Sequence, residues 1–105
     1  MKIRLAVAVL LLALAVPADA NAAHYVIEIN HMAFGPAPTH LKVGDTIEWK
    51  NLDIFRHTAT ARTGEFNVDL LPGAKAQVTL AKPGTINVFC RFHPTMTVRL
   101  DVASP

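Results

Sequence analysis

The sequence predicts an all-β domain, folded as an antiparallel sandwich or barrel of seven or eight short strands. Three observations support this prediction. After residue 20, apolar and polar side chains alternate with a period of two, and β-branched residues are frequent. No segment shows the 3.6-residue period of an amphipathic helix. Short clusters of glycine, proline and aspartate separate the alternating runs, as turns between strands require.

The first four predicted strands cover residues 24–30, 40–43, 46–51 and 56–61. Ile27 and Ile29 alternate in the first of these, and Ile47 and Trp49 alternate in the third. Side chains two residues apart in a strand lie on the same face, so each of these two strands has an apolar face. The turn sequence VGD separates the second strand from the third.

The last four predicted strands cover residues 66–70, 74–80, 85–90 and 97–102. The turn sequences LPG and KPG precede the second and third of them. All but the first show period-2 apolar alternation, which we expect to form the core together with two aromatic residues. These core residues are Val78, Leu80, Ile86, Val88, Val98, Leu100, Val102, Phe34 and Phe66.

The N-terminal segment is predicted to be a signal peptide covering residues 1–20. Lys2 and Arg4 precede an unbroken apolar run over residues 5–16, which is too short for a membrane span of about 20 residues. The sequences ADA and ANA both fit an A-x-A cleavage site, so cleavage follows either residue 20 or residue 22. We therefore expect a single exported domain over residues 21–105, in the periplasm, with no membrane span after signal removal.

The net charge and the single cysteine limit the partners and the chemistry expected of this domain. Removal of residues 1–20 takes away Lys2, Arg4 and Asp19, which lowers the formal net charge from +2 to +1. A nearly neutral domain without charge runs argues against nucleic acid or an anionic membrane surface as a partner. One cysteine cannot form an internal disulfide, so an exported protein with a single thiol at Cys90 is expected to bury or bind it.

The stretch CRFHPTM places a thiol, an imidazole and a thioether at even spacing, on Cys90, His93 and Met96. A blue copper site uses one thiolate and two imidazoles in a near-trigonal arrangement, with a long axial thioether. His57 is the candidate for the second imidazole, because it begins a predicted strand that can lie against the end of the Cys90 strand. The predicted metal ligands are therefore His57, Cys90, His93 and Met96, with one copper ion per chain.

Residues 29–102 resemble the cupredoxins, the small blue copper proteins of the plastocyanin, pseudoazurin and amicyanin kind. The sequence LKVGDTIEWKN, followed by a histidine, matches the first half of the family pattern, and GTINVFCRFHPTM matches the second half. The spacing C-x2-H-x2-M is that of the short amicyanin loop, and Pro94 after the histidine agrees with it. The resemblance implies a Greek-key β-sandwich that holds copper.

Two positions depart from the family pattern. Arg91-Phe92 stands where amicyanin-like loops carry Thr-Pro. Thr58 follows the first ligand histidine, where an asparagine often bridges the two ligand segments by a hydrogen bond. A threonine hydroxyl can make such a bond. Because residues around the ligands tune a metal site, we expect a redox potential particular to this protein.

The expected function is to carry single electrons between redox partners by cycling between Cu(II) and Cu(I), without enzymatic activity. The resemblance implies a c-type cytochrome or a dehydrogenase as partner, and we expect docking near His93, Phe92 and Pro94. Phe55 and Met32 either extend this apolar patch or pack the core. We expect the protein to be a monomer.

Other functions fit the same residues less well. Copper storage or delivery is the main alternative, because it would use the same ligands without electron shuttling. A cysteine enzyme with a histidine base is disfavoured, since no oxyanion or orienting motif accompanies Cys90. Zinc is also disfavoured as the metal, because it gains little from the thioether of Met96.

Overall fold

The structure is a computed structural model that describes residues 21–105. The predicted signal peptide, residues 1–20, lies outside the described residues. In the described part of the chain there is no helix long and apolar enough to cross a membrane.

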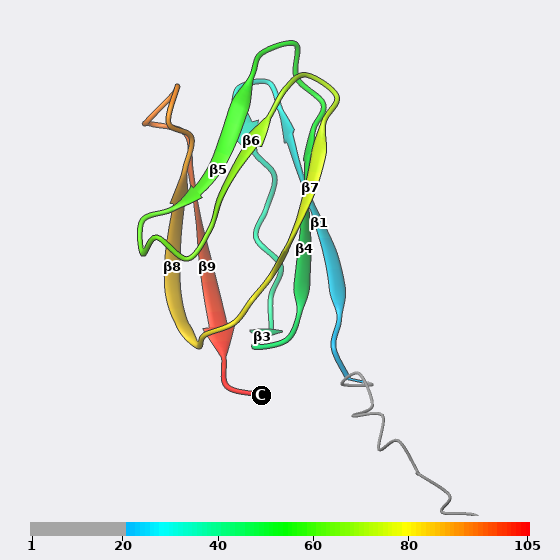
Figure 1. The fold of residues 1–105 in the computed structure, drawn as a ribbon, viewed down its shortest axis with the longest axis vertical. Helices are drawn as coiled ribbons and strands as arrows, with labels where there is room; N and C mark the ends of the chain where they lie inside the picture. The colour runs from blue at the N-terminus through cyan, green and yellow to red at the C-terminus, as the bar shows by residue number, and fades with distance from the viewer. Residues whose placement is uncertain (1–20) are drawn as a thin grey trace, which may run out of the picture.

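Residues 21–105 form two sheets that face each other as a sandwich (Figure 1). One sheet contains, in spatial order, β2 (Ala33–Phe34), β1 (His24–Asn30), β4 (Thr46–Asn51) and β7 (Lys75–Thr79). The other contains β3 (Leu41–Lys42), β9 (Thr97–Ala103), β8 (Gly84–Phe89), β5 (His57–Ala61) and β6 (Asn67–Leu70). Because β4 neighbours β7 in one sheet and β5 neighbours β8 in the other, the chain crosses between the sheets in Greek-key fashion. The predicted all-β sandwich is confirmed.

Strand direction differs from the prediction, because each sheet contains one parallel pair. Strand β1 runs parallel to β4, and β3 runs parallel to β9, whereas the remaining pairs are antiparallel. A parallel pair needs a crossover connection of about a dozen residues or more. Residues 31–45 form such a connection between β1 and β4, and on the way they add β2 to one sheet and β3 to the other. Alternation of side chains shows which face is buried, but it carries no information on the direction of the neighbouring strand.

All eight predicted strands occur in residues 21–105, with ends within one residue of the prediction. The ninth, β2, was not predicted. It follows a two-residue turn in which His31 and Met32 have φ angles of 50° and 60°. Hairpin turns with two positive φ angles usually contain Asn-Gly or Asp-Gly, so the sequence lacked the usual signal. The side chain of Asn30 accepts a hydrogen bond from the His31 N–H at 2.9 Å and supports this turn.

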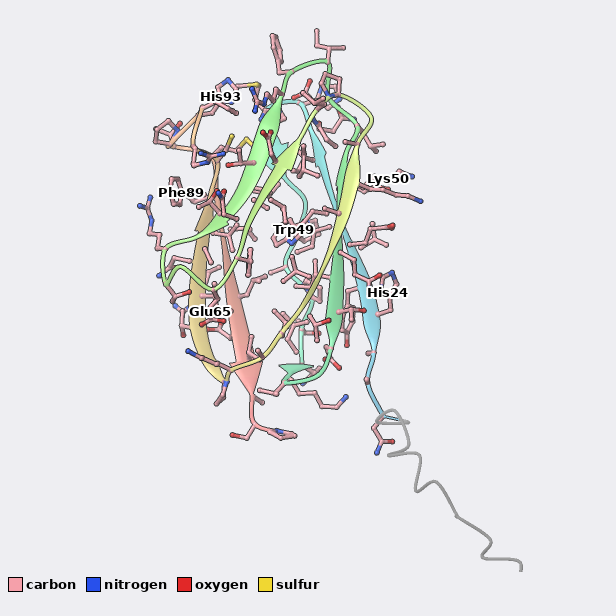
Figure 2. All side chains as sticks on the ribbon, viewed as in Figure 1. His24, Trp49, Lys50, Glu65, Phe89 and His93 are labelled. Carbon is pink, nitrogen blue, oxygen red and sulfur yellow. The ribbon has the colours of Figure 1, made fainter. Side chains whose placement is uncertain are left out.

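Trp49 occupies the centre of the core between the sheets (Figure 2). Its ring lies 5.6 Å from the ring of Phe34 in an edge-to-face contact and 6.0 Å from the ring of Phe66. Such aromatic pairs add to the stabilisation that burial alone provides. The two phenylalanines are half-buried and pack against the core, as predicted from the sequence. The core therefore fills the sandwich and leaves the ends of the strands to position the functional residues.

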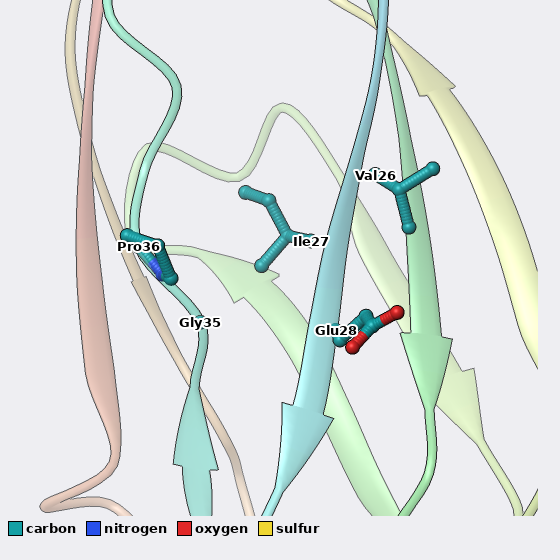
Figure 3. Close-up of a pocket in the computed structure, with 5 residues that line it drawn as sticks. All are labelled: Val26, Ile27, Glu28, Gly35 and Pro36. Carbon is teal, nitrogen blue, oxygen red and sulfur yellow. The ribbon is translucent and has the colours of Figure 1, made fainter.

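A pocket of about 220 Å³ lies between β1 and the connection that follows β2 (Figure 3). Its lining residues are Val26, Ile27, Glu28, Gly35 and Pro36. Gly35 allows the connection to approach β1 closely, because a Cβ atom there would lie 3.2 Å from the carbonyl oxygen of Glu28. None of the predicted metal ligands lines this pocket.

Candidate metal centre

The antiparallel pairing of β5 and β8 brings the predicted ligands to one end of the sandwich. Phe89, the last residue of β8, pairs with Thr60 near the end of β5, so the residues that follow β8 run back toward the start of β5. His57 is the first residue of β5, and Cys90 directly follows β8. Figure 2 shows His93 at the same end of the molecule, beyond Phe89. The local sequence thus places one ligand at the start of a strand and the others on the loop to the next strand.

Backbone hydrogen bonds hold the ligand loop in a compact form. The His93 N–H donates to the carbonyl oxygen of Cys90 at 3.3 Å, and the Met96 N–H donates to that of His93 at 2.9 Å. The Cys90 N–H donates to the Met96 carbonyl oxygen at 3.1 Å, which closes the loop. Met96 is 5% exposed at the end of this loop. The predicted ligands are three residues apart because one turn joins Cys90 to His93 and a second turn joins His93 to Met96.

Three candidate donor atoms converge at this end of the sandwich. The Sγ atom of Cys90 lies 3.7 Å from Nδ1 of His57 and 3.7 Å from Nδ1 of His93. The donor atoms of these three residues all lie within 4.8 Å of one another, a separation that one metal ion can bridge. His57 and Cys90 are fully buried, whereas His93 is partly exposed. The structure therefore brings together three of the four residues predicted as ligands and places Met96 next to them in the closed loop.

Cys90 is prepared to act as a thiolate. Burial raises the pKa of its thiol, but the hydrogen bonds donated by the Thr58 and Phe92 backbones and the His57 and His93 rings beside the sulfur together lower the pKa to about 6. The Thr58 N–H donates to Sγ at 3.4 Å. The thiolate is the form that binds metals, so these hydrogen bonds favour metal binding near neutral pH.

Thr58 bridges the two segments that carry the ligands. Its Oγ1 accepts a hydrogen bond from the Arg91 N–H at 2.9 Å and lies 2.9 Å from Oγ1 of Thr60. The expectation that a threonine hydroxyl makes this bridge is therefore confirmed. Thr58 is fully buried, so these polar contacts are shielded from water.

The sequence analysis missed Asp53. Its Oδ2 lies 2.9 Å from Nε2 of His57, on the side of the ring opposite the cysteine. Hydrogen bonds from the His57 side chain and from the Met32 backbone outweigh burial and lower the pKa of the Asp53 carboxyl group. The signal that could have found it is its position four residues before the ligand histidine, in the loop that precedes β5.

Exposed apolar side chains lie in the segments that connect the strands at the end of the sandwich with the metal centre. The exposed ones at loops and strand ends are Met32, Leu52, Ile54, Phe55, Leu71 and Phe92. The Phe55 ring lies 6.5 Å from the ring of His93, and the guanidinium groups of Arg56 and Arg91 lie 4.9 and 5.8 Å from the centre of the Phe92 ring. The sequence left open whether Phe55 and Met32 belong to a docking patch or to the core. Phe55 is 49% exposed and Met32 is 39% exposed, so neither is buried in the core.

The donor set is a thiolate and two imidazoles, with a thioether in the same loop. Soft sulfur favours Cu(I) and imidazole also suits Cu(II), so this mixture fits copper in both oxidation states. A two-sheet β-sandwich with such a centre at one end defines a small copper protein of the blue type.

Comparison with known proteins agrees with this class. A sequence profile of the cupredoxin-like domain matches residues 3–100. The chain therefore belongs to the cupredoxin-like family, and the family and donor set together identify copper as its cofactor. A search of curated protein sequences gave no match.

Solved structures of similar fold include two amicyanins and an enzyme. An amicyanin variant in its reduced state is 28% identical, with a TM-score of 0.65 over 76% of this chain and 82% of that chain. Amicyanin from Paracoccus versutus is 24% identical, with a TM-score of 0.64 over 84% of this chain and 87% of that chain. A copper-containing nitrite reductase from Thermus scotoductus is 24% identical, with a TM-score of 0.64, and the match covers 77% of this chain but 22% of that chain.

Proposed function

We propose that this protein is an exported carrier of single electrons, with one copper ion bound by His57, Cys90, His93 and Met96. The observation that supports the proposal most strongly is the convergence of the thiol and the two imidazoles, whose donor atoms lie within 4.8 Å of one another. Copper in such a site supplies one-electron chemistry between Cu(II) and Cu(I).

The protein residues have different roles in this proposal. Cys90, His57 and His93 would bind the copper ion strongly, and Met96 would bind it weakly through its thioether. The closed loop and the strand ends keep these groups in place, so little rearrangement accompanies a change of oxidation state. Small rearrangement is what a carrier of electrons needs.

The partly exposed ring of His93 is the proposed route for the electron to the surface. Phe92 and Pro94 flank it on the loop, and both are exposed. Electron-transfer encounters use small, weak interfaces, so an apolar patch with little charge suits the docking of a redox partner. A c-type cytochrome or a dehydrogenase is the proposed partner, and the protein acts as a monomer.

The proposed location is the periplasm. The support is the N-terminal sequence, in which residues 1–20 have the charged start, the short apolar run and the A-x-A site of a secretory signal. Cleavage after residue 20 or residue 22 leaves the whole sandwich in the mature chain. N-terminal sequencing of the exported protein tests this point directly.

Electron transfer is tested by repeated reduction and oxidation of the copper-loaded protein, with the bound copper measured after each cycle. We expect reversible cycling with full retention of copper. A parallel measurement follows copper transfer to a chelator from each oxidation state. Rapid release from a site that does not cycle would contradict the proposal and would favour copper delivery instead.

A further inference from the structure

Asp53 contacts the side of the His57 ring that points away from the metal centre. Its Oδ2 lies 2.9 Å from Nε2 of His57, whereas Nδ1 of the same ring lies 3.7 Å from Sγ of Cys90. The His57 and Asp53 side chains are 0% and 9% exposed, so water competes little for this contact. His93 differs, because no carboxylate of residues 21–105 lies within ion-pair distance of its ring.

Backbone N–H groups of two different segments hold the Asp53 carboxylate in place. The Met32 N–H donates to Oδ2 at 3.0 Å, and the Ile54 N–H donates to Oδ1 at 2.8 Å. The Asp53 N–H donates to Oδ1 of the buried Asn51 at 2.9 Å. Two backbone N–H groups therefore hold the carboxylate in addition to His57, one at each of its oxygens.

These contacts determine which nitrogen of His57 carries the hydrogen. A neutral imidazole has one N–H group and one free lone pair, and an ionised carboxylate only accepts hydrogen bonds. Nε2 of His57 therefore donates to Asp53, which leaves the lone pair of Nδ1 directed toward Cys90 and His93. A carboxylate in this position also orients the ring and makes the ligand nitrogen more basic.

We infer that Asp53 is a positioning residue of the copper centre, which fixes the His57 tautomer and stabilises Cu(II) relative to Cu(I). The inference rests on the proposed copper site and adds a residue that sets its potential. A fixed negative charge beside a ligand interacts more favourably with the more highly charged ion. The reduction potential is therefore lower than it would be with an uncharged partner at this position.

The substitution Asp53→Asn tests the inference, because asparagine keeps an acceptor oxygen for His57 and removes the charge. We expect the affinity for Cu(II) to fall about tenfold or more, as is typical when a residue behind a ligand is changed. The affinity for Cu(I) should fall less. A tenfold change in the ratio of the two affinities corresponds to a rise in potential of about 59 mV for a one-electron couple.

Asp69→Asn is the matched control. Asp69 lies opposite Thr58 in the neighbouring strand and pairs with Arg56, so the control removes one negative charge nearby without touching a ligand. We expect a smaller rise in potential in the control than in Asp53→Asn. Equal shifts in the two variants, or no shift in a folded Asp53→Asn protein, would overturn the inference.

A second measurement uses nitrogen-edited NMR of the His57 ring in the full mature protein. In both the apoprotein and the diamagnetic Cu(I) form, we expect a slowly exchanging Nε2–H signal that moves in Asp53→Asn and stays in place in Asp69→Asn. A wild-type ring protonated at Nδ1 in the apoprotein would overturn the inference. Because the apoprotein needs no copper, this result is independent of whether the proposed electron-carrier function is correct.

Discussion

Thr58 shows how a single side chain can connect the two ligand segments. Its N–H donates to Sγ of Cys90, and its Oγ1 accepts a hydrogen bond from the Arg91 N–H at 2.9 Å. The backbone bond to sulfur survives any substitution except proline, but the hydroxyl bond does not. The side chain therefore joins β5 to the ligand loop independently of the metal.

The substitution Thr58→Val keeps the shape of this side chain and removes the hydroxyl group. We expect the free energy of unfolding of the apoprotein to fall by about 1–3 kcal/mol, because the Arg91 N–H loses its acceptor. Thr79→Val is the control, since Thr79 is an exposed residue of β7 in the other sheet and does not contact Thr58 or the ligand loop. Urea denaturation measures both variants, and an equal loss in the two would contradict the role of Thr58.

The contacts of the Phe92 ring explain part of the Arg91-Phe92 sequence, which departs from the family pattern. The guanidinium groups of Arg56 and Arg91 lie within 4.9 and 5.8 Å of its ring centre, close enough for cation–π interactions. Arg56 is itself bound to Asp69 of β6. The exposed ring is thus held on the loop beside His93 instead of moving freely in solvent.

The substitution Phe92→Ala should slow electron transfer to a redox partner by roughly tenfold, as expected for an aromatic residue at the centre of an interface. The potential should stay the same, because Phe92 is not a ligand. Val26→Ala is a matched control, since Val26 is 46% exposed and Phe92 is 47% exposed, but Val26 lies on β1 in the other sheet. Stopped-flow kinetics with a c-type cytochrome measures both. Unchanged kinetics in Phe92→Ala would remove this face as the docking surface.

At the scale of elements, the Asp45 side chain connects the start of β4 to β3 and to the segment before β1 by hydrogen bonds. The carboxylate is fully buried and accepts hydrogen bonds from the Ala23 N–H at 2.8 Å and the Lys42 N–H at 3.0 Å. Burial raises the pKa of Asp45, but these bonds and the Lys42 side chain together lower it below its usual value. The carboxylate thus ties the segment before β1 and the short strand β3 to β4.

This shift predicts how stability depends on pH. A carboxyl group with a lowered pKa in the folded state contributes stability above the unfolded pKa of about 3.9, and loses it as the pH falls through the folded value. We expect Asp45→Asn to lower the free energy of unfolding by about 1–3 kcal/mol at pH 7. The difference from the wild type should shrink below pH 4. Urea denaturation from pH 7 to pH 2.5 measures it, and a difference that stays constant with pH would contradict this assignment.

The elements could be predicted from sequence to different degrees. Strands such as β1 and β4 were predicted with their observed ends, because regular alternation marks a half-buried strand. The parallel pairing of β1 with β4 could not be predicted, since it depends on where the long connection passes. Strand β2 was missed because its turn uses His31 and Met32 in a backbone conformation that usually needs glycine.

At the scale of the whole molecule, the candidate site follows from the antiparallel pairing of β5 with β8. The ligand types and their spacing were readable from the sequence, because few functions need a thiol, an imidazole and a thioether in seven residues. The contact of Asp53 with His57 could not be predicted from the sequence. It depends on the path of the loop before β5, which Asn51 and the backbone of Met32 fix by hydrogen bonds.

The visible absorption spectrum of the protein loaded with one copper ion tests the central claim most directly. A Cys90 thiolate bound to Cu(II) beside two imidazoles predicts an intense blue colour that bleaches on reduction and is absent in Cys90→Ser. Zinc-loaded wild type should be colourless and serves as the control. A copper protein without the blue band, or a blue band that persists in folded Cys90→Ser, would contradict the account.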